Sequence, residues 1–97
     1  SQLVPQNVHH GVVARTVFVD HQPQVVIQRV DALSPAEKAG FLVGDIISSI
    51  DGTAVKGVPD LVHYLQKKKF GDTCIVEIER DGTKISYSVT LFEIEEE

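Results

Sequence analysis

The chain has 97 residues, of which 42% are hydrophobic and 24% are charged. A chain of this length buries roughly 60–70% of its unfolded surface, which is enough for one hydrophobic core. No apolar run in the sequence approaches the ~18 residues of a membrane-spanning helix. Because the chain contains no Met, we expect it to be a piece of a longer protein. Its single cysteine, Cys74, excludes an internal disulfide and a cysteine-built zinc site.

The net charge of −5 comes mainly from the C-terminal end. Four of the fourteen acidic residues lie within residues 93–97, and the other ten nearly balance the nine Lys and Arg residues. The sequence therefore has no basic face and no stripe rich in aromatic residues, which are the usual features of nucleic-acid binding. We exclude nucleic acid as a partner and expect no membrane contact by these residues.

The first third of the chain predicts a linker and two strands. Residues 1–10 are polar and show no period, so we predict a linker or lead-in segment there. Residues 12–19 are rich in β-branched Val and Thr, which favour a strand. The polar residues 21–24 interrupt this pattern, and the apolar residues 25–30 predict the returning strand.

Residues 34–40 carry the signals of a helix of about two turns. Ser34 suits the N-cap and Pro35 suits the first helical position. Glu37 lies where a capping box places its acid, and Gly40 suits the C-terminal cap. The segment therefore predicts a short helix with both ends capped.

The middle of the chain predicts two short strands and a longer helix. Residues 46–50 read as a strand, Asp51-Gly52 as a tight turn, and residues 53–56 as the returning strand. After them, four aliphatic residues occupy the i, i+3, i+4 and i+7 positions of one helical face. These residues are Val58, Leu61, Val62 and Leu65.

The last part of the chain predicts a β-hairpin followed by a frayed end. Residues 74–79 and residues 84–91 alternate between apolar and polar side chains, and the turn pair Asp81-Gly82 separates them. This alternation indicates an antiparallel hairpin with one face in water and Cys74 on the inward face. We expect the acidic residues 93–97 to be frayed or to begin a connector.

The spacing of several motifs identifies a family. The segment AGFLVGDIISSIDG at residues 39–52 resembles the PDZ signature A-G-L-x-x-G-D-x-I-x-x-I-[DN]-G. The motifs SPA at 34–36, FGD at 70–72 and ERDG at 79–82 match the pattern that surrounds this signature in bacterial members. The chain is most similar to the PDZ modules of HtrA (DegP-like) serine proteases. PDZ modules of Lon-like, C-terminal-processing and site-two proteases also resemble it.

The resemblance implies a mostly β fold, a partly open barrel or sandwich of five to six strands capped by two α-helices. The PDZ domain would span residues 11–92, between a linker at 1–10 and an acidic tail at 93–97. The parent protein would be a protease, most closely a serine protease, in the periplasm or cell envelope.

The resemblance also implies a peptide-binding groove between a strand and the longer helix. The loop that binds the peptide carboxylate would comprise His10, Gly11 and Val12. The strand that pairs with the peptide would comprise Val13, Ala14 and Arg15. The helix wall would comprise Val58, Leu61, Val62 and Leu65. Relatives usually carry an aliphatic residue where this chain has His10.

The resemblance implies a peptide-binding function for this groove. The module would capture apolar protein C-termini, or extended peptides, by adding them to its sheet as a strand, and so serve substrate recognition or regulation of an attached protease. The alternative is an interaction or assembly module of a scaffold or secretion-system protein with a fixed partner. In isolation we expect a monomer.

The sequence contains no pattern that indicates catalysis or a cofactor in this domain. His9 and His10 lack a carboxylate or cysteine at ligand spacing, so no metal site is predicted. No nucleophile-elbow pattern accompanies Ser34, Ser48 or Ser49, and Ser34 already serves as a helix cap. We therefore expect no enzymatic activity and no cofactor in these residues.

Overall fold

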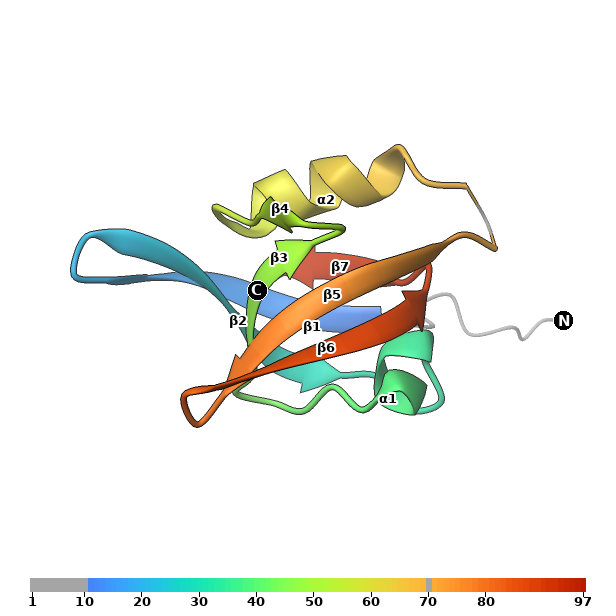
Figure 1. Ribbon diagram of the computed structural model, residues 1–97, viewed down its shortest axis with the longest axis horizontal. Coiled ribbons are helices and arrows are strands. Elements are labelled where there is room, and N and C mark those ends of the chain that lie inside the picture. Colours follow the sequence, from blue (N-terminus) through green and yellow to red (C-terminus); the bar gives the residue numbers. More distant parts are fainter. Residues whose placement is uncertain (1–10, 70) are drawn as a thin grey trace, which may run out of the picture.

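The computed structural model describes residues 11–69 and 71–97 (Figure 1). The predictions for residues 1–10 and for Phe70 lie outside the described residues. The elements are β1 (Gly11–Val19), β2 (Gln22–Val30), α1 (Pro35–Ala39), β3 (Ile46–Ile50), β4 (Thr53–Ala54), α2 (Val58–Gln66), β5 (Thr73–Arg80), β6 (Thr83–Thr90) and β7 (Glu93–Glu96). The predicted mostly β fold with two helices is confirmed, and the structure adds one strand at the C-terminal end. Neither helix in the described part is long and apolar enough to cross a membrane.

One sheet contains the seven strands of the described residues, in the order β6-β5-β3-β2-β1-β7, with β4 paired to β3. All of the strand pairs are antiparallel except β1 and β7, which run parallel. The hairpin of β1 and β2 extends well beyond the rest of the sheet, and α1 and α2 lie on opposite sides of the molecule (Figure 1). The arrangement leaves α2 above the sheet beside β7, which it contacts.

The turn between β1 and β2 is shorter than the sequence predicted. Only Asp20 and His21 form it, with φ of 50° and 66°. Two left-handed residues match the right-handed twist of the flanking strands, so β2 can begin directly at Gln22. Pro23, which suggested a break, pairs with Phe18 inside the hairpin. It is tolerated because this end of the hairpin lies beyond the neighbouring strand β3, which pairs only with Val25 and Val26 of β2.

The short helix α1 begins and ends as predicted. The Ser34 hydroxyl accepts a hydrogen bond from the Glu37 backbone N–H at 3.2 Å, and Gly40 adopts φ of 110° at the C-terminal cap. The Glu37 carboxylate accepts from the N–H of Leu33 at 2.8 Å, one residue before the N-cap. The caps thus satisfy backbone groups at both ends of a helix too short to be stable alone.

The hydrophobic core lies between the curved sheet and the two helices. Phe41 is fully buried, and its ring contacts Tyr87 and Phe92 edge-on at centroid distances of 5.4 and 5.8 Å. Cys74 is buried on the inward face of β5, as predicted, while the neighbouring Ile75 is half exposed. Burial raises the pKa of the Cys74 thiol, so this side chain behaves as an inert core residue.

The expectation that residues 93–97 fray is wrong. Glu93–Glu96 form β7, and the register pairs Gly11 with Glu93 and Ala14 with Glu96. Ile94 is only 9% exposed, and Phe92 just before the strand is 3% exposed. These two apolar side chains hold the acidic segment on the protein, while the glutamates around them face solvent.

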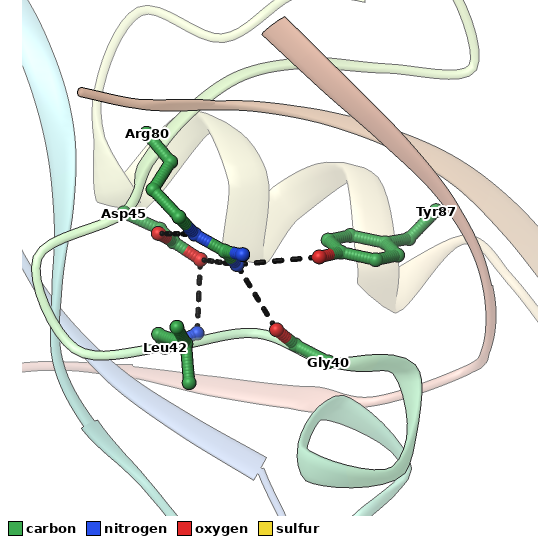
Figure 2. Close-up of polar contacts among 5 residues, drawn as sticks. All are labelled: Gly40, Leu42, Asp45, Arg80 and Tyr87. Atoms are coloured by element: carbon green, nitrogen blue, oxygen red, sulfur yellow. Dashed lines mark hydrogen bonds and ion pairs between the residues drawn. The ribbon is translucent and has the colours of Figure 1, made fainter. Parts of the chain in front are cut away.

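An ion pair joins the loop after α1 to the hairpin of β5 and β6. The guanidinium of Arg80 donates to both carboxylate oxygens of Asp45 at 2.8 Å, and to the carbonyl of Gly40 at 3.0 Å (Figure 2). Asp45 also accepts from the N–H of Leu42 at 2.9 Å. Burial acts to raise the pKa of Asp45, but the hydrogen bonds from Arg80 and Leu42 outweigh it and lower that pKa.

Removing the cation from this pair should destabilise the fold strongly. Asp45 is 1% exposed, so Arg80→Met leaves a buried carboxylate without its partner. We expect the free energy of unfolding, measured by urea denaturation, to fall by about 3 kcal/mol. Arg15→Met is the matched control, because it removes an ion pair whose side chains are 57% and 49% exposed, and it should cost less than about 1 kcal/mol. Equal losses in the two variants would contradict this role for Asp45 and Arg80.

Candidate functional site

A groove of about 650 Å³ runs along α2. Its helix side is formed by Val62, Leu65 and Gln66. The other side consists of Leu91, Phe92, Glu93, Ile94 and Glu95, and Pro35 of α1 also lines the groove. The lining is mainly apolar, which suits an apolar side chain of a ligand.

The four predicted wall residues of α2 divide into two pairs. Val62 and Leu65 line the groove. Val58 and Leu61 are 0% exposed and belong to the core instead. The helix therefore presents Val62 and Leu65 to the groove, and Leu65, which is 7% exposed, joins Val58 and Leu61 in attaching the helix to the core.

Two sets of contacts hold α2 in place. At its first turn, the N–H of Val58 donates to the hydroxyl of Thr16 on β1 at 3.0 Å. Toward its other end, the hydroxyl of Tyr64 donates to Asp51 at 2.6 Å, and the ammonium of Lys68 lies 2.9 Å from the same carboxylate. The two contacts fix the distance between the helix wall and the sheet, and with it the width of the groove.

Asp51 is the centre of the second contact. It also accepts from the N–H of Ile75 at 2.8 Å. The hydrogen bond from Tyr64, followed by those from Ile75 and Lys68, lowers the pKa of Asp51 to about 2. From the sequence, Asp51 is predicted only as part of a turn and of the PDZ signature, and its contacts with Tyr64 and Lys68 are not predicted. The available signal was the four-residue spacing of Tyr64 and Lys68 near the C-terminal end of the predicted helix.

The predicted carboxylate loop is described only from Gly11 onward, and His10 lies outside the described residues. The N–H of Gly11 donates to the carboxylate of Asp31 at 3.0 Å, and the N–H of Asp31 donates to the Gly11 carbonyl at 2.8 Å. Arg29 also pairs with Asp31, at 2.9 Å. The Gly11 amide thus already binds a carboxylate, one supplied by the chain itself. Val12 is 1% exposed and contributes its side chain to the core.

The predicted peptide-pairing strand has no free edge in this structure. Val13 and Ala14 pair with Glu95 and Glu96 of β7, and the N–H of Glu97 donates to the Ala14 carbonyl at 2.8 Å. The guanidinium of Arg15 forms an ion pair with Glu97 at 3.0 Å. β7 therefore lies between the predicted pairing strand and the groove along α2.

The described residues offer no group of three or more His, Cys, Asp or Glu that could hold a metal ion. Ser34 donates to the Asp31 carbonyl at 2.7 Å and caps α1, while Ser48 donates to the carbonyl and the carboxylate of Glu77 at 3.0 and 3.1 Å. Both hydroxyls therefore have structural partners.

Comparison with known proteins supports this description. The family model described as PDZ domain matches residues 16–91. The serine protease Do-like HtrA of Bacillus subtilis is 36% identical over 95 residues, covering 96% of this chain and 21% of that protein. The probable periplasmic serine endoprotease DegP-like of Ectopseudomonas mendocina is 30% identical over 84 residues, covering 87% of this chain and 18% of that protein. The chain thus spans about a fifth of the length of these relatives.

A solved structure with a similar fold carries a ligand. The HtrA3 PDZ domain bound to a phage-derived ligand, FGRWV, aligns with a TM-score of 0.71 at 19% sequence identity. The alignment covers 82% of this chain and 80% of that one. At this level of identity the match establishes the fold.

The contacts of Asp51 should make the free energy of unfolding depend on pH in the acidic range. The pKa of Asp51 is below its ordinary value of 3.8, so folding favours the carboxylate. Its stabilising effect is complete above about pH 4 and is lost as the pH falls toward 2. We expect Asp51→Asn to be less stable than the wild type at pH 7, with the difference shrinking between pH 4 and pH 2 in urea unfolding series. A difference that stays constant over this range would contradict the assignment.

Proposed function

The chain belongs to the PDZ domain family, and on this premise we propose that it binds the apolar C-termini of other proteins in the groove along α2. The observation that carries the proposal is the groove itself, whose helix wall is lined by Val62 and Leu65 and whose opposite wall includes β7, the strand paired to the edge of β1. A peptide on this edge gains backbone hydrogen bonds from the strand and places alternate side chains toward the helix.

The chemistry of the wall sets the preferred ligand. Val62 and Leu65 are aliphatic, so the terminal side chain should be Val, Leu, Ile, Ala or Phe, and an acidic side chain would be left without a partner. The Gly11 amide, which binds the Asp31 carboxylate here, belongs to the loop proposed to hold the peptide carboxylate. Individual affinities should be about micromolar, or about −8 kcal/mol.

The similar proteins suggest what this binding serves. The two relatives described above are serine proteases, and one of them is described as periplasmic. We propose that this PDZ domain is part of an HtrA-like serine protease of the cell envelope, where it recruits substrates with apolar C-termini or regulates the attached protease. The ligand named for the HtrA3 PDZ domain ends in the sequence RWV, an apolar C-terminus of this kind.

One observation favours the second candidate function, an assembly module with a fixed partner. The edge of β1 that a peptide would use is paired with β7. If that pairing were permanent, the domain could not bind C-termini at this edge and would serve its parent through another surface.

Peptide titration of the domain separates the two functions. We expect pentapeptides ending in Val, Leu or Phe to shift the amide NMR signals of Val13–Arg15 and Leu65, because Val13–Arg15 form the proposed pairing strand and Leu65 lines the groove. The same peptides with an amidated C-terminus should cause no shift, since they lack the carboxylate. Unchanged signals at these positions with every peptide would favour the assembly module.

The groove wall can be tested with one pair of variants. Val62→Asp places a charge on the apolar wall and should weaken binding of a peptide ending in Val at least tenfold, a loss of about 1.4 kcal/mol. His63→Asp is the matched control, because His63 is the exposed next residue of α2, and it should leave the dissociation constant within about twofold. Isothermal titration calorimetry measures both. Equal affinities of the two variants would place the ligand outside this groove.

A further inference from the structure

We infer that β7 is a built-in competitor of the peptide ligand, a strand that occupies the edge of β1 beside the groove and must leave it before a C-terminus can bind there. This inference rests on the proposed function, because it assumes that the edge of β1 is the peptide site. It assigns a regulatory role to residues 93–97.

β7 occupies the place that a bound peptide would take on β1. β7 lies between β1 and α2, which are the two sides of the proposed site. The parallel register from Gly11 to Ala14 uses the residues that the peptide would use. The Glu97 N–H extends the occupied stretch through its bond to Ala14. A ligand and β7 therefore cannot both pair with this part of β1.

Ile94 takes the place of an apolar side chain of the ligand. Within β7 it is the only apolar residue, and it is 9% exposed. It lines the same groove as Val62 and Leu65 and pairs with Val12 at the start of β1. An apolar side chain at this place, next to the predicted carboxylate loop, takes the position expected for the terminal side chain of a peptide. β7 thus mimics the ligand in its side chain as well as in its backbone.

β7 packs closely against the backbone of Gly11. A Cβ atom on Gly11 would collide with the carbonyl of Glu93, so β7 lies directly against the backbone of the predicted carboxylate loop. Meanwhile the Gly11 amide binds the side-chain carboxylate of Asp31. While β7 is paired, the edge of β1 and the Gly11 amide therefore both have hydrogen-bond partners within the chain.

The composition of β7 indicates that its pairing is weak. Only four residues pair, in the parallel direction, which is slightly less stable per residue than the antiparallel direction expected for a ligand. Glutamate is a poor strand former, and three of the four residues are glutamates that face solvent. The ion pair between Arg15 and Glu97 is about half exposed on both sides and adds little.

The chain also contains a hinge point for the release of β7 from β1. Phe92 is 3% exposed and packs edge-on against Phe41, so the chain is anchored in the core immediately before β7. Release of residues 93–97 then withdraws one buried side chain, Ile94, from the core, while Phe92 stays packed against Phe41. When only a fraction of molecules is open, the apparent dissociation constant of a ligand rises by the inverse of that fraction.

Weakening β7 should tighten peptide binding. Ile94→Ser removes the apolar anchor, and we expect it to lower the dissociation constant of a pentapeptide ending in Val by about tenfold if roughly one molecule in ten is open in the wild type. Ile75→Ser is the matched control: it makes the same change at an exposed isoleucine of β5 and should leave the constant unchanged. A chain ending at Phe92 provides a second open variant should Ile94→Ser fold poorly.

Strengthening β7 should have the opposite effect. Glu96→Val improves strand propensity on the same side of β7 as Ile94 and removes one like charge. We expect it to weaken peptide binding several-fold. In the wild type, saturating peptide should also speed hydrogen exchange at the Glu97 amide, because its bond to Ala14 is lost on release.

The outcomes distinguish this inference from the proposed function. If the wild type binds the peptide and Ile94→Ser and the chain ending at Phe92 bind it equally well, the competitor role is overturned and peptide binding stands. If only the open variants bind, β7 is a competitor that keeps the isolated domain almost entirely closed. If neither the wild type nor any open variant binds, the proposed function fails, and the competitor role fails with it.

Discussion

The paired hydrogen bonds between Arg80 and Asp45 are the interaction on which the rest of the fold depends. Asp45 directly precedes β3 in the middle of the sheet, and Arg80 ends β5, so one ion pair ties the chain after α1 to the C-terminal hairpin (Figure 2). The same guanidinium reaches the Gly40 carbonyl and the Tyr87 hydroxyl. Because Asp45 is buried, loss of Arg80 would leave a desolvated carboxylate without its cation, whereas the side chain of Arg80 is 27% exposed.

The part of the fold that the Arg80–Asp45 ion pair holds together positions the groove. α2 is attached to β1 by Thr16 at its first turn and to the turn after β3 by Asp51 toward its other end. Since both ends of α2 are attached, the wall formed by Val62 and Leu65 is held in place beside the groove. Such a preorganised gap lowers the entropic cost of ligand binding.

A binding mode that adds a strand requires an open sheet edge, and an open edge also invites unwanted pairing with other chains. The position of β7 offers one solution to this conflict. The edge of β1 is covered by a short acidic segment of the same chain, held mainly by Ile94. A covering strand of this kind would protect the edge and also set a threshold for ligands, which must bind well enough to displace it.

The sequence by itself determined the order and type of nearly all elements, the caps of α1, and the family. These features are local: Ser34 and Gly40 act on adjacent backbone groups, and the alternation around Cys74 and the i, i+4 stripe on α2 report which side chains face the core.

Only the tertiary structure decided the fate of residues 93–97, because their glutamates predict no strand and their pairing partner lies some eighty residues earlier in the chain. It also decided which aliphatic residues of α2 reach the groove and which enter the core, and it brought Asp51, Tyr64 and Lys68 together. Contacts between distant segments depend on how the sheet curves and where α2 lies, and a one-dimensional pattern contains neither.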